Sequence, residues 1–574
     1  MGEQKPTAQG HRASVAAIRD RPSAEVLVIG GGINGIATFR ELALQGVDVV
    51  LVERGDFVSG ASAASSHMIH GGVRYLENGE FRLVAEAVRE RNRLLKNAPH
   101  YVRPLQTTIP VFSTFSGLLA APMRFLSHRQ RTTRERGALL IKVGLLIYDA
   151  FSRDGGSVPR HRFVGRKKAL QSMPKLNPSV KYAATYFDAS MHDPERLALD
   201  VLWDGVESGS GRASNYLEAA AAEGRTIILR DVVTGESFDL TAKVIINTTG
   251  PWTDLTNRSL GLFTRFMGGT KGSHIVLDNA ELLEAVGGRE LFFENNDGRI
   301  VLIYPLKGKV MVGTTEIDAD PSKPAVCTDE EVDYFFSLIQ HVLPSVRIRK
   351  EDIVYRFSGI RPLPRHDDEV PGFVSRDYRI EREKLDNDRT LLSLVGGKWT
   401  TFRALGEHMA DEALKLIGKQ RAISTRDMPI GGGRNFPSDP SAREKWITSF
   451  AGANSRDRVS QLLERYGTRA AHMLPALAGE RSLLHSDRFS VEEIEYLVRH
   501  EQVASLRDVI YRRTNLAFLG ELSPGLVYEI AEISARILEW SDAKKSAELA
   551  ILMTDLDELH GVRIRLNADG RQGG

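Results

Sequence analysis

The feature that constrains this chain most is a glycine turn set between a short strand and a helix near the start of the sequence. Residues 25–29 (EVLVI) form an apolar run, rich in β-branched side chains, that predicts a buried strand. The run leads into GGGING, which places glycines at Gly30, Gly32 and Gly35. Apolar spacing over residues 34–45 predicts the helix that follows. This order of strand, GxGxxG turn and helix is typical of a dinucleotide-binding unit.

The segment after this helix completes the pattern. Gly46 fits a left-handed helix cap, and residues 47–52 predict a second strand that ends at Glu53. In such a unit the glycines allow a tight turn and a close approach of the pyrophosphate, which the helix N-terminus binds. Glu53 is placed to accept hydrogen bonds from ribose hydroxyls. A glycine turn that serves only close packing is the alternative, but it leaves the position of Glu53 unexplained.

Two later segments repeat the combination of a strand and a glycine turn. Residues 242–252 predict a β-branched strand that ends in such a turn. Residues 391–401 predict a strand and a Gly396-Gly397 turn, and a helix follows over 402–417. Three elements of this kind, drawn from distant parts of the chain, indicate an extended cofactor and therefore favour FAD over NAD.

Composition places the chain among globular proteins. Hydrophobic residues make up 42% and charged residues 26%, and 76 Lys and Arg nearly balance 74 Asp and Glu, which argues against a disordered chain and against a basic nucleic-acid-binding protein. The single cysteine, Cys327, excludes an internal disulfide and a cysteine-based metal site. No apolar run reaches the length of a membrane-spanning helix, and residues 1–23 predict a disordered leader rather than an export signal. We therefore expect a cytoplasmic protein.

The remaining segments predict two further kinds of structure. Residues 299–315 form two β-rich runs around a Lys-Gly turn, the pattern of a hairpin in an antiparallel sheet. A glycine- and proline-bearing segment at 430–440 marks a domain boundary. Beyond it the periodicity is helical at 491–501 and at 524–540, where Ser523 is the expected N-cap.

Several blocks of this sequence resemble the FAD-dependent glycerol-3-phosphate dehydrogenases of the aerobic, respiratory type. The resemblance spans residues 24–418 and continues more weakly beyond them. It rests on VIGGGINGIA (28–37), ASSHMIHGGVRYLENGEFRLVAEA (64–87), KGSHIV (271–276), VGTTEID (312–318), FSGIRPL (357–363), SRDY (375–378) and GGKWTTFR (396–403). The glycine fingerprint and the GGK turn occur widely among flavin oxidases, so the combination of blocks carries the resemblance.

The resemblance implies an α/β fold with three parts and a defined reaction. An FAD-binding Rossmann-like domain is interleaved with an antiparallel-sheet substrate domain within 24–430, and a helical C-terminal domain follows over 431–574. The expected segments are about 24–100, 170–260 and 355–425 for the FAD-binding domain and about 100–170 and 260–355 for the substrate domain. The implied reaction oxidises sn-glycerol 3-phosphate to dihydroxyacetone phosphate by hydride transfer to FAD, and the electrons pass to membrane ubiquinone.

The resemblance also assigns residues to the substrate. A polyol phosphate is a dianion, and arginine can bind a phosphate group through two N–H hydrogen-bond donors at once. Arg361 and Arg376 are therefore the expected phosphate ligands, with Arg74 and Tyr75 close by. His274 is the first candidate for the base, or for a ligand of the substrate hydroxyl.

A second group of residues is expected beside the flavin. The cationic side chain of Lys398 would stabilise anionic reduced flavin or a developing alkoxide, and Thr401 follows at the same helix start. The residues expected to contact FAD are Gly30, Gly32, Asn34, Gly35, Glu53, Ser62, Ser66, His70, Gly250, Gly359, Gly396, Gly397, Lys398 and Thr400.

Three features depart from the family pattern and leave the substrate open. His67 stands where the family usually has lysine, Glu316 stands where it usually has aspartate, and residues 186–197 differ from the usual acidic pattern. Another polyol phosphate, such as erythritol phosphate, is therefore an alternative substrate. An oxidase or dehydrogenase of an amino or hydroxy acid, or a flavin-binding protein without catalytic activity, are further alternatives.

A locally basic stretch bears on membrane contact. Residues 124–168 contain 12 Lys or Arg against three acids, interleaved with an apolar run over 139–147. Such a stretch can bind an anionic lipid surface, and this predicts a peripheral position on the inner face of the cell membrane. A solvated loop followed by an ordinary core helix is the alternative. No nucleic-acid-binding module is recognisable, and a homodimer is compatible with the sequence.

Overall fold

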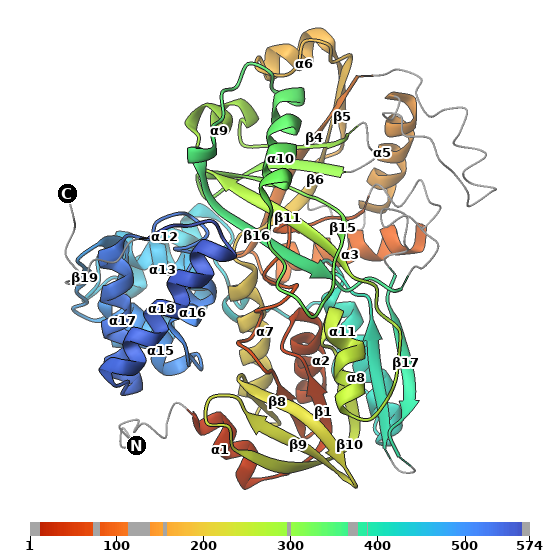
Figure 1. Cartoon of the computed structure of the whole chain (residues 1–574). Coiled ribbons are helices and arrows are strands. Elements are labelled where there is room, and N and C mark those ends of the chain that lie inside the picture. Colours follow the sequence, from red (N-terminus) through yellow and green to blue (C-terminus); the bar gives the residue numbers. More distant parts are fainter. Residues whose placement is uncertain are drawn as a thin grey trace.

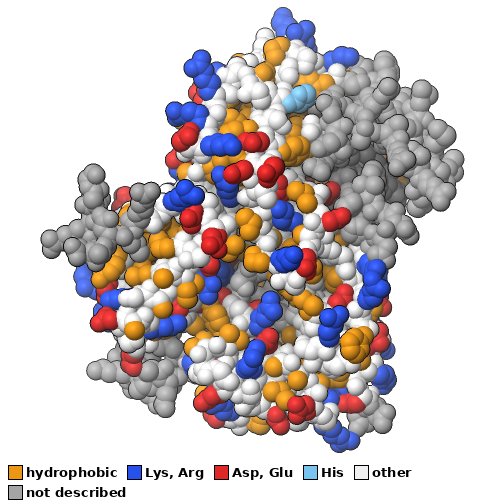
Figure 2. All heavy atoms as spheres, in the orientation of Figure 1, with side chains coloured by type: hydrophobic (Ala, Val, Ile, Leu, Met, Phe, Trp, Pro, Cys, Tyr) orange, Lys and Arg blue, Asp and Glu red, His pale blue; other side chains and the backbone are white. Residues whose placement is uncertain are grey.

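The computed structural model describes residues 12–72, 81–112, 138–152, 158–295, 300–365, 377–386 and 389–564. In Figure 1 one sheet with its helices lies at the bottom, a second sheet lies at the top, and the C-terminal helices lie at the left. Figure 2 shows Lys and Arg side chains interspersed with Asp and Glu over the described part of this face, as expected from the near balance of charge. No helix in the described part of the chain is long and apolar enough to cross a bilayer.

The first sheet has a parallel core in the order β18-β10-β1-β2-β7. These strands are β1 (Ser23–Ile29), β2 (Val49–Val52), β7 (Gly211–Ser214), β10 (Ser237–Asn247) and β18 (Thr390–Val395). Antiparallel β17 (Arg379–Lys384) borders β18, and the hairpin of β8 (Leu217–Glu223) and β9 (Thr226–Asp231) extends β10. All residues of β2 and β18 are buried, as a parallel sheet covered on both faces requires.

Four helices of the described chain accompany this sheet, and two of them follow its strands where the sequence predicts helices. They are α2 (Ile33–Leu44), α7 (Pro194–Glu207), α8 (Thr253–Ser259) and α11 (Phe402–Leu416). Helix α2 packs between α7 and α11, and Gly46 ends it in the left-handed region at φ +72°. The predicted α/β fold with a Rossmann-like FAD-binding domain is confirmed.

The second sheet has the order β15-β11-β14-β13-β12-β4-β6-β3, with β16 beside β11 and β5 beside β6. Its strands are β3 (Met68–Ile69), β4 (Val102–Val111), β5 (Arg162–Gly165), β6 (Tyr182–Met191), β11 (Thr270–Leu277), β12 (Glu290–Glu294), β13 (Ile300–Leu306), β14 (Lys309–Gly313), β15 (Ile317–Asp318) and β16 (Ile353–Arg361). All pairs are antiparallel except β4 with β12. The predicted hairpin is confirmed, and Lys307 and Gly308 form its turn at φ +52° and +83°.

Both faces of the second sheet are covered. Ile275 and Leu277 of β11 pack on α9 (Ala280–Val286) and α10 (Asp329–Val342), while Val276 between them packs toward the C-terminal helices. Helices α3 (Phe81–Asn97), α5 (Ala138–Ser152) and α6 (Arg166–Ser172) flank the edge formed by β4, β5 and β6. Side chains of α3 and α5 form a separate apolar cluster there.

Two expected boundaries differ from the observed ones. The chain leaves the second sheet after Met191 and again after Arg361, later than the expected changes near residues 170 and 355, because β6 and β16 both pair with strands of that sheet. The described part of the expected disordered leader, residues 12–23, contains helix α1 (Ala13–Asp20) and the first residue of β1. Val15 and Ile18 of this helix are buried against the first sheet, and that burial explains the order.

The C-terminal part is helical, as predicted. Its helices are α12 (Pro440–Phe450), α13 (Arg456–Tyr466), α14 (Ala470–Met473), α15 (Val491–His500), α16 (Leu506–Asp508), α17 (Pro524–Leu538) and α18 (Asp542–Glu558). Ser523 caps α17 by accepting a hydrogen bond from the backbone N–H of Leu526. This confirms the predicted N-cap.

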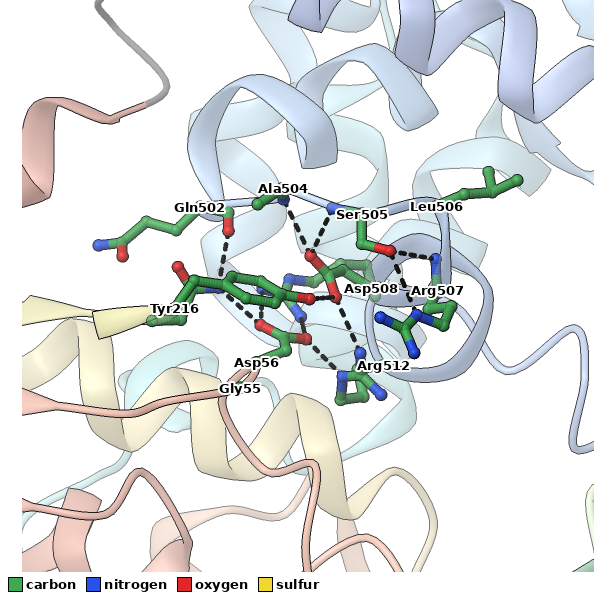
Figure 3. Close-up of polar contacts among 12 residues, drawn as sticks. Gly55, Asp56, Tyr216, Gln502, Ala504, Ser505, Leu506, Arg507, Asp508 and Arg512 are labelled. Atoms are coloured by element: carbon green, nitrogen blue, oxygen red, sulfur yellow. Dashed lines mark hydrogen bonds and ion pairs between the residues drawn. The ribbon is translucent and has the colours of Figure 1, made fainter. Parts of the chain in front are cut away.

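A buried ionic network joins these helices to the loop after β2 (Figure 3). The Asp56 carboxylate accepts two hydrogen bonds from Arg513, at 2.7 and 2.9 Å, and a further one from Arg512. Arg512 also pairs with Asp508 at 2.8 Å, and Tyr216 donates to the same Asp508 oxygen at 2.6 Å. Burial opposes ionisation of Asp56, but the two arginines outweigh it and hold its pKa below the usual range.

Candidate active site

A cavity of about 480 Å³ lies at the carboxyl ends of β1, β2 and β10. Parallel α/β sheets bind their ligands at this edge. Six of the residues predicted to contact FAD line it: Gly30, Gly32, Asn34, Glu53, Ser62 and Gly250. Gly35 packs against the backbone of the glycine turn, where a Cβ would be 2.0 Å from the carbonyl oxygen of Gly30. The fingerprint glycines therefore allow the turn to pack closely and leave the start of α2 open to the cavity.

The polar groups of this cavity suit a nucleotide. Glu53 accepts hydrogen bonds from the backbone N–H groups of Gly31 at 2.7 Å and Gly55 at 2.8 Å, and burial raises its pKa. The hydroxyl of Ser62 accepts from the N–H of Ile33 in the first turn of α2. The side-chain oxygen of Asn34 is buried and has no hydrogen-bond partner among the described residues. A polar ligand is needed to complete these contacts.

A second cavity of about 260 Å³ adjoins the first, since Ala61 and Pro362 line both. An extended cofactor and its substrate would occupy the two adjoining cavities together. Eight further predicted residues line this second cavity: Ser66, His70, His274, Gly359, Arg361, Gly397, Lys398 and Thr400. The structure thus brings the phosphate, base and flavin candidates together from distant parts of the chain.

The closing glycine turn is fixed to the loop that carries Ser62 and His70. Trp399 donates its indole N–H to the carbonyl of Ser62 at 3.0 Å, and the Thr400 hydroxyl donates to the carbonyl of His70 at 3.2 Å. Gly397 has φ +117°, and a Cβ there would lie 2.4 Å from the Asn34 amide nitrogen. These contacts hold the loop, the turn and α2 around a common space.

His274 projects into the second cavity from β11. Its Nε2 lies 2.9 Å from the Ser66 hydroxyl, and its ring stacks on Phe357 with the ring centres 4.7 Å apart. Burial, reinforced by the positive charge of Arg361, lowers the pKa of His274 well below its usual value. His274 is therefore a neutral imidazole at physiological pH and can accept a proton.

Arg361 ends β16 beside His274. It donates to the Thr314 hydroxyl at 2.8 Å and pairs with Glu316 at 3.5 Å. Gly272 makes room for the guanidinium, since a Cβ there would lie 2.3 Å from its NH2 group. A fixed cation thus faces the cavity, and the carboxylate that replaces the family aspartate lies beside it.

Other predicted residues lie elsewhere. Arg74, Tyr75 and Arg376 fall outside the described residues. Gly396 lies behind the turn against Tyr378, at φ +93°, and is not in contact with the cavity. Thr401 is the N-cap of α11 and is buried away from the cavity lining.

Sequence reasoning missed one buried acid. Asp188 of β6 lines the second cavity and accepts hydrogen bonds from the Gly71 N–H at 2.9 Å and from Arg91 at 3.1 Å, which orients the loop after His70. An acid inside the β-rich run YFDAS was the available signal. His67 lines a different cavity, so its side chain does not face Arg361.

Comparison with known proteins agrees with this geometry. Residues 25–412 match the family model described as FAD dependent oxidoreductase, and residues 423–545 match the C-terminal domain of alpha-glycerophosphate oxidase. The chain is 33% identical to a glycerol-3-phosphate dehydrogenase of Synechocystis sp., over 86% of this chain and 89% of that protein. It is 30% identical to a D-erythritol 1-phosphate dehydrogenase of Brucella abortus, over 85% and 94%.

A solved structure supports the fold. The glycerol-3-phosphate dehydrogenase of Bacillus halodurans, crystallised with FAD, superimposes with a TM-score of 0.74 at 23% identity and covers 96% of this chain and 98% of its own. The glycine cradle, Glu53 and the orphaned oxygen of Asn34 fit the same cofactor. Family matches along both parts of the chain, together with this site, show that the chain belongs to the FAD-dependent glycerol-3-phosphate dehydrogenase family.

Proposed function

We propose that the chain oxidises the secondary alcohol of sn-glycerol 3-phosphate to the ketone of dihydroxyacetone phosphate. The observation that carries this proposal is that Arg361 and His274 line one cavity with the Gly397-Lys398 turn. A cation for the phosphate, a neutral base and the expected flavin position thus lie together. FAD, when bound, supplies the acceptor for the hydride that leaves the substrate carbon.

The residues of the site have separate tasks in this reaction. Arg361 binds the phosphate and is oriented by Thr314 and Glu316. His274 accepts the hydroxyl proton, and its bond to Ser66 and its stacking on Phe357 fix the ring. Lys398 contributes positive charge where the oxygen of the substrate becomes negative.

Erythritol phosphate is the second candidate substrate. The D-erythritol 1-phosphate dehydrogenase of Brucella abortus is almost as similar as the first relative, and Glu316 beside Arg361 carries the charge of the usual aspartate on a side chain that is one methylene longer. Anaerobic mixing of the purified yellow protein with glycerol 3-phosphate, erythritol phosphate or a 2-hydroxy acid tests the assignment through loss of flavin absorbance. We expect glycerol 3-phosphate to bleach the flavin fastest. Faster bleaching by erythritol phosphate would identify erythritol phosphate as the substrate. If neither polyol phosphate bleaches the flavin, both substrate assignments are refuted.

We further propose that ubiquinone receives the electrons and that the protein is peripheral on the inner face of the cell membrane. Val143 and Leu146 on α5 are 47% and 55% exposed, and Arg166, Lys167 and Lys168 are exposed on α6 at the same edge of the second sheet. Apolar side chains beside cations suit an anionic lipid surface. Flotation with vesicles tests this: binding to phosphatidylglycerol vesicles that high salt weakens is expected, and equal binding to neutral vesicles contradicts it.

A further inference from the structure

The second cavity has a polar wall that the proposed reaction leaves without a task. Tyr186 and Asp188 of β6 form this wall, and they are only 3% and 1% exposed. Arg361 and His274 enter the same cavity from β16 and β11. In the sheet, β14, β13, β12 and β4 lie between β11 and β6, so the two pairs of residues reach the cavity from different sides.

One oxygen of the Asp188 carboxylate is saturated with donors, and the other is not. Its Oδ1 accepts hydrogen bonds from the Gly71 N–H at 2.9 Å, from Arg91 at 3.1 Å and from the Tyr148 hydroxyl. Its Oδ2 has no hydrogen-bond donor among the described residues. A buried carboxylate oxygen without a donor is costly, and a ligand hydroxyl in the cavity would supply the donor.

The hydroxyl of Tyr186 is a second unused group. The Tyr186 ring meets that of Tyr148 edge to face, with ring centres 5.6 Å apart, and this contact fixes its direction. The Tyr186 hydroxyl makes no hydrogen bond with another residue of the described chain. Burial, reinforced by the charge of Asp188, raises the pKa of Tyr186 well above its usual value of 10. The hydroxyl therefore keeps its proton and can both donate and accept.

One peptide group, between His70 and Gly71, ties this wall to the expected flavin side of the cavity. Its N–H donates to Asp188 at 2.9 Å, and its carbonyl accepts from the Thr400 hydroxyl at 3.2 Å. Thr400 directly follows the turn at 396–399 that is expected beside the flavin. Because a peptide group is planar and rigid, these two bonds hold Asp188 close to that turn.

The surroundings of the wall suit an uncharged group. Phe292, Leu302 and Met68 also line the cavity and offer no side-chain hydrogen bond to a polar ligand. The ion pair with Arg91 balances the charge of Asp188. A hydroxyl group that donates to the Oδ2 of Asp188 and accepts from the nearby tyrosine would satisfy both unused groups at once. The cavity thus has a cationic side and a side that matches an alcohol.

We propose that Tyr186 and Asp188 bind the free hydroxyl at the end of the polyol that is remote from the phosphate. The proposal rests on the proposed function and deepens it by assigning substrate specificity to this wall. Arg361 binds the phosphate, and His274 takes the proton of the hydroxyl that is oxidised. No bond is made or broken at the wall, so its two residues select the substrate and take no part in the chemical step.

The position of the wall in the sequence agrees with this role. Residues 186 and 188 are two positions apart on one strand, so their side chains lie on the same face of the sheet. Both belong to the segment 186–197, which departs from the family pattern. A site that hydrogen-bonds a substrate hydroxyl rejects a ligand without it, because the buried polar groups of the site are then left unpaired. The choice of polyol therefore depends on this segment.

Calorimetric titration of the oxidised holoenzyme with two ketone phosphates tests the proposal. Dihydroxyacetone phosphate and hydroxyacetone phosphate differ only in the hydroxyl remote from the phosphate, and neither carries a secondary alcohol, so binding is measured without turnover. We expect the wild type to bind dihydroxyacetone phosphate about tenfold more tightly, since a hydrogen bond to a carboxylate is charge-assisted. Tyr186→Phe should lower this ratio about threefold. Asp188→Asn, which puts an amide in place of the unused oxygen, should lower the ratio as well.

The ratio separates recognition from a structural effect. A substitution that only loosens the site weakens both ligands alike and leaves the ratio unchanged. Tyr528→Phe, at a tyrosine of α17 that is 40% exposed, is the matched control and should keep the wild-type ratio. The proposal is overturned if the wild type binds both ketones equally well, or if Tyr186→Phe and Asp188→Asn both keep the wild-type ratio.

Bleaching of the flavin by glycerol 3-phosphate, measured on the same samples, distinguishes this proposal from the proposed function. Normal bleaching of the wild type with equal binding of the two ketones overturns the role of the wall alone. Absence of bleaching, with no binding of either ketone, refutes the proposed substrate and the role of the wall together. Absence of bleaching with a ratio that falls in the variants refutes the substrate but supports the wall as a hydroxyl site.

Discussion

The buried contact between Asp56 and the C-terminal helices allows the sharpest stability prediction. Asp56→Asn keeps the size of the side chain but removes the negative charge that pairs with Arg513 and Arg512, both of which are buried or nearly so. After the substitution Arg512 still pairs with Asp508. Arg513 still donates to the Glu501 carbonyl at 2.7 Å, but the Glu501 carboxylate lies 3.6 Å away. Breaking a buried ion pair from one side costs about 3–5 kcal/mol. Since the shift is the lost free energy divided by the entropy of unfolding, which grows with chain length, we expect the melting temperature to fall by about 3–4 °C.

The same substitution should weaken FAD binding. Asp56 follows Gly55, whose N–H donates to Glu53 and whose carbonyl accepts from the N–H of Tyr216 at 2.8 Å. A loop freed from the C-terminal helices holds Glu53 less firmly, so flavin fluorescence, which reports released FAD, should rise at a lower temperature than in the wild type.

A surface variant and a double variant control this experiment. Glu236→Gln breaks an exposed pair with Arg19 and should cost less than about 1 kcal/mol. Arg513→Met combined with Asp56→Asn removes the orphaned guanidinium, so the double variant should lose less stability than the two single losses added together. The reasoning is refuted if Asp56→Asn melts within about 1 °C of Glu236→Gln, because about 1 °C is the shift expected for a loss of about 1 kcal/mol in a chain of this length.

Three further outcomes are expected. Arg361→Ala should raise the KM for the polyol phosphate by about 10- to 100-fold with unchanged flavin content, because a charge-assisted contact of about 1.5–3 kcal/mol is lost; an unchanged KM removes this arginine from the site. Gly397→Ala, whose Cβ would meet the Asn34 amide at 2.4 Å in a backbone of φ +117°, should yield protein largely free of flavin, and normal flavin absorbance would contradict this. The folded-state pKa of Glu195, about 8, exceeds the ordinary 4.5, so wild-type stability falls as pH rises through that interval. Glu195→Gln should therefore gain in melting temperature relative to the wild type between pH 5 and pH 8, and a gap that does not change with pH would contradict the assigned pKa.

Much of the cofactor site could be predicted from the sequence. The turn at Gly30, the helix that ends at Gly46 and the N-cap at Ser523 depend on residues within a few positions of one another, so spacing alone reveals them. Matching blocks then indicated that His274 and Arg361 belong to one site, and the structure places both in the same cavity.

Other features follow only from contacts between distant segments. The sequence indicated that His67 departs from the family pattern. That its ring stacks on Phe518, more than four hundred positions away, follows only from the tertiary structure. Nothing in the local sequence distinguishes Asp188 or Asp56 from other acids, because their arginine partners, Arg91 and Arg513, lie far away along the chain.

The sequence by itself determined that a nucleotide binds at the edge of a parallel sheet and which blocks carry the chemistry, because turns, caps and strand patterns are set by neighbours in the chain. Only the tertiary structure decided how the C-terminal helices bind the loop after Glu53 through Asp56. Burial and charge pairing there arise from side chains on separate elements, and their energies depend on a surrounding space that no local pattern records.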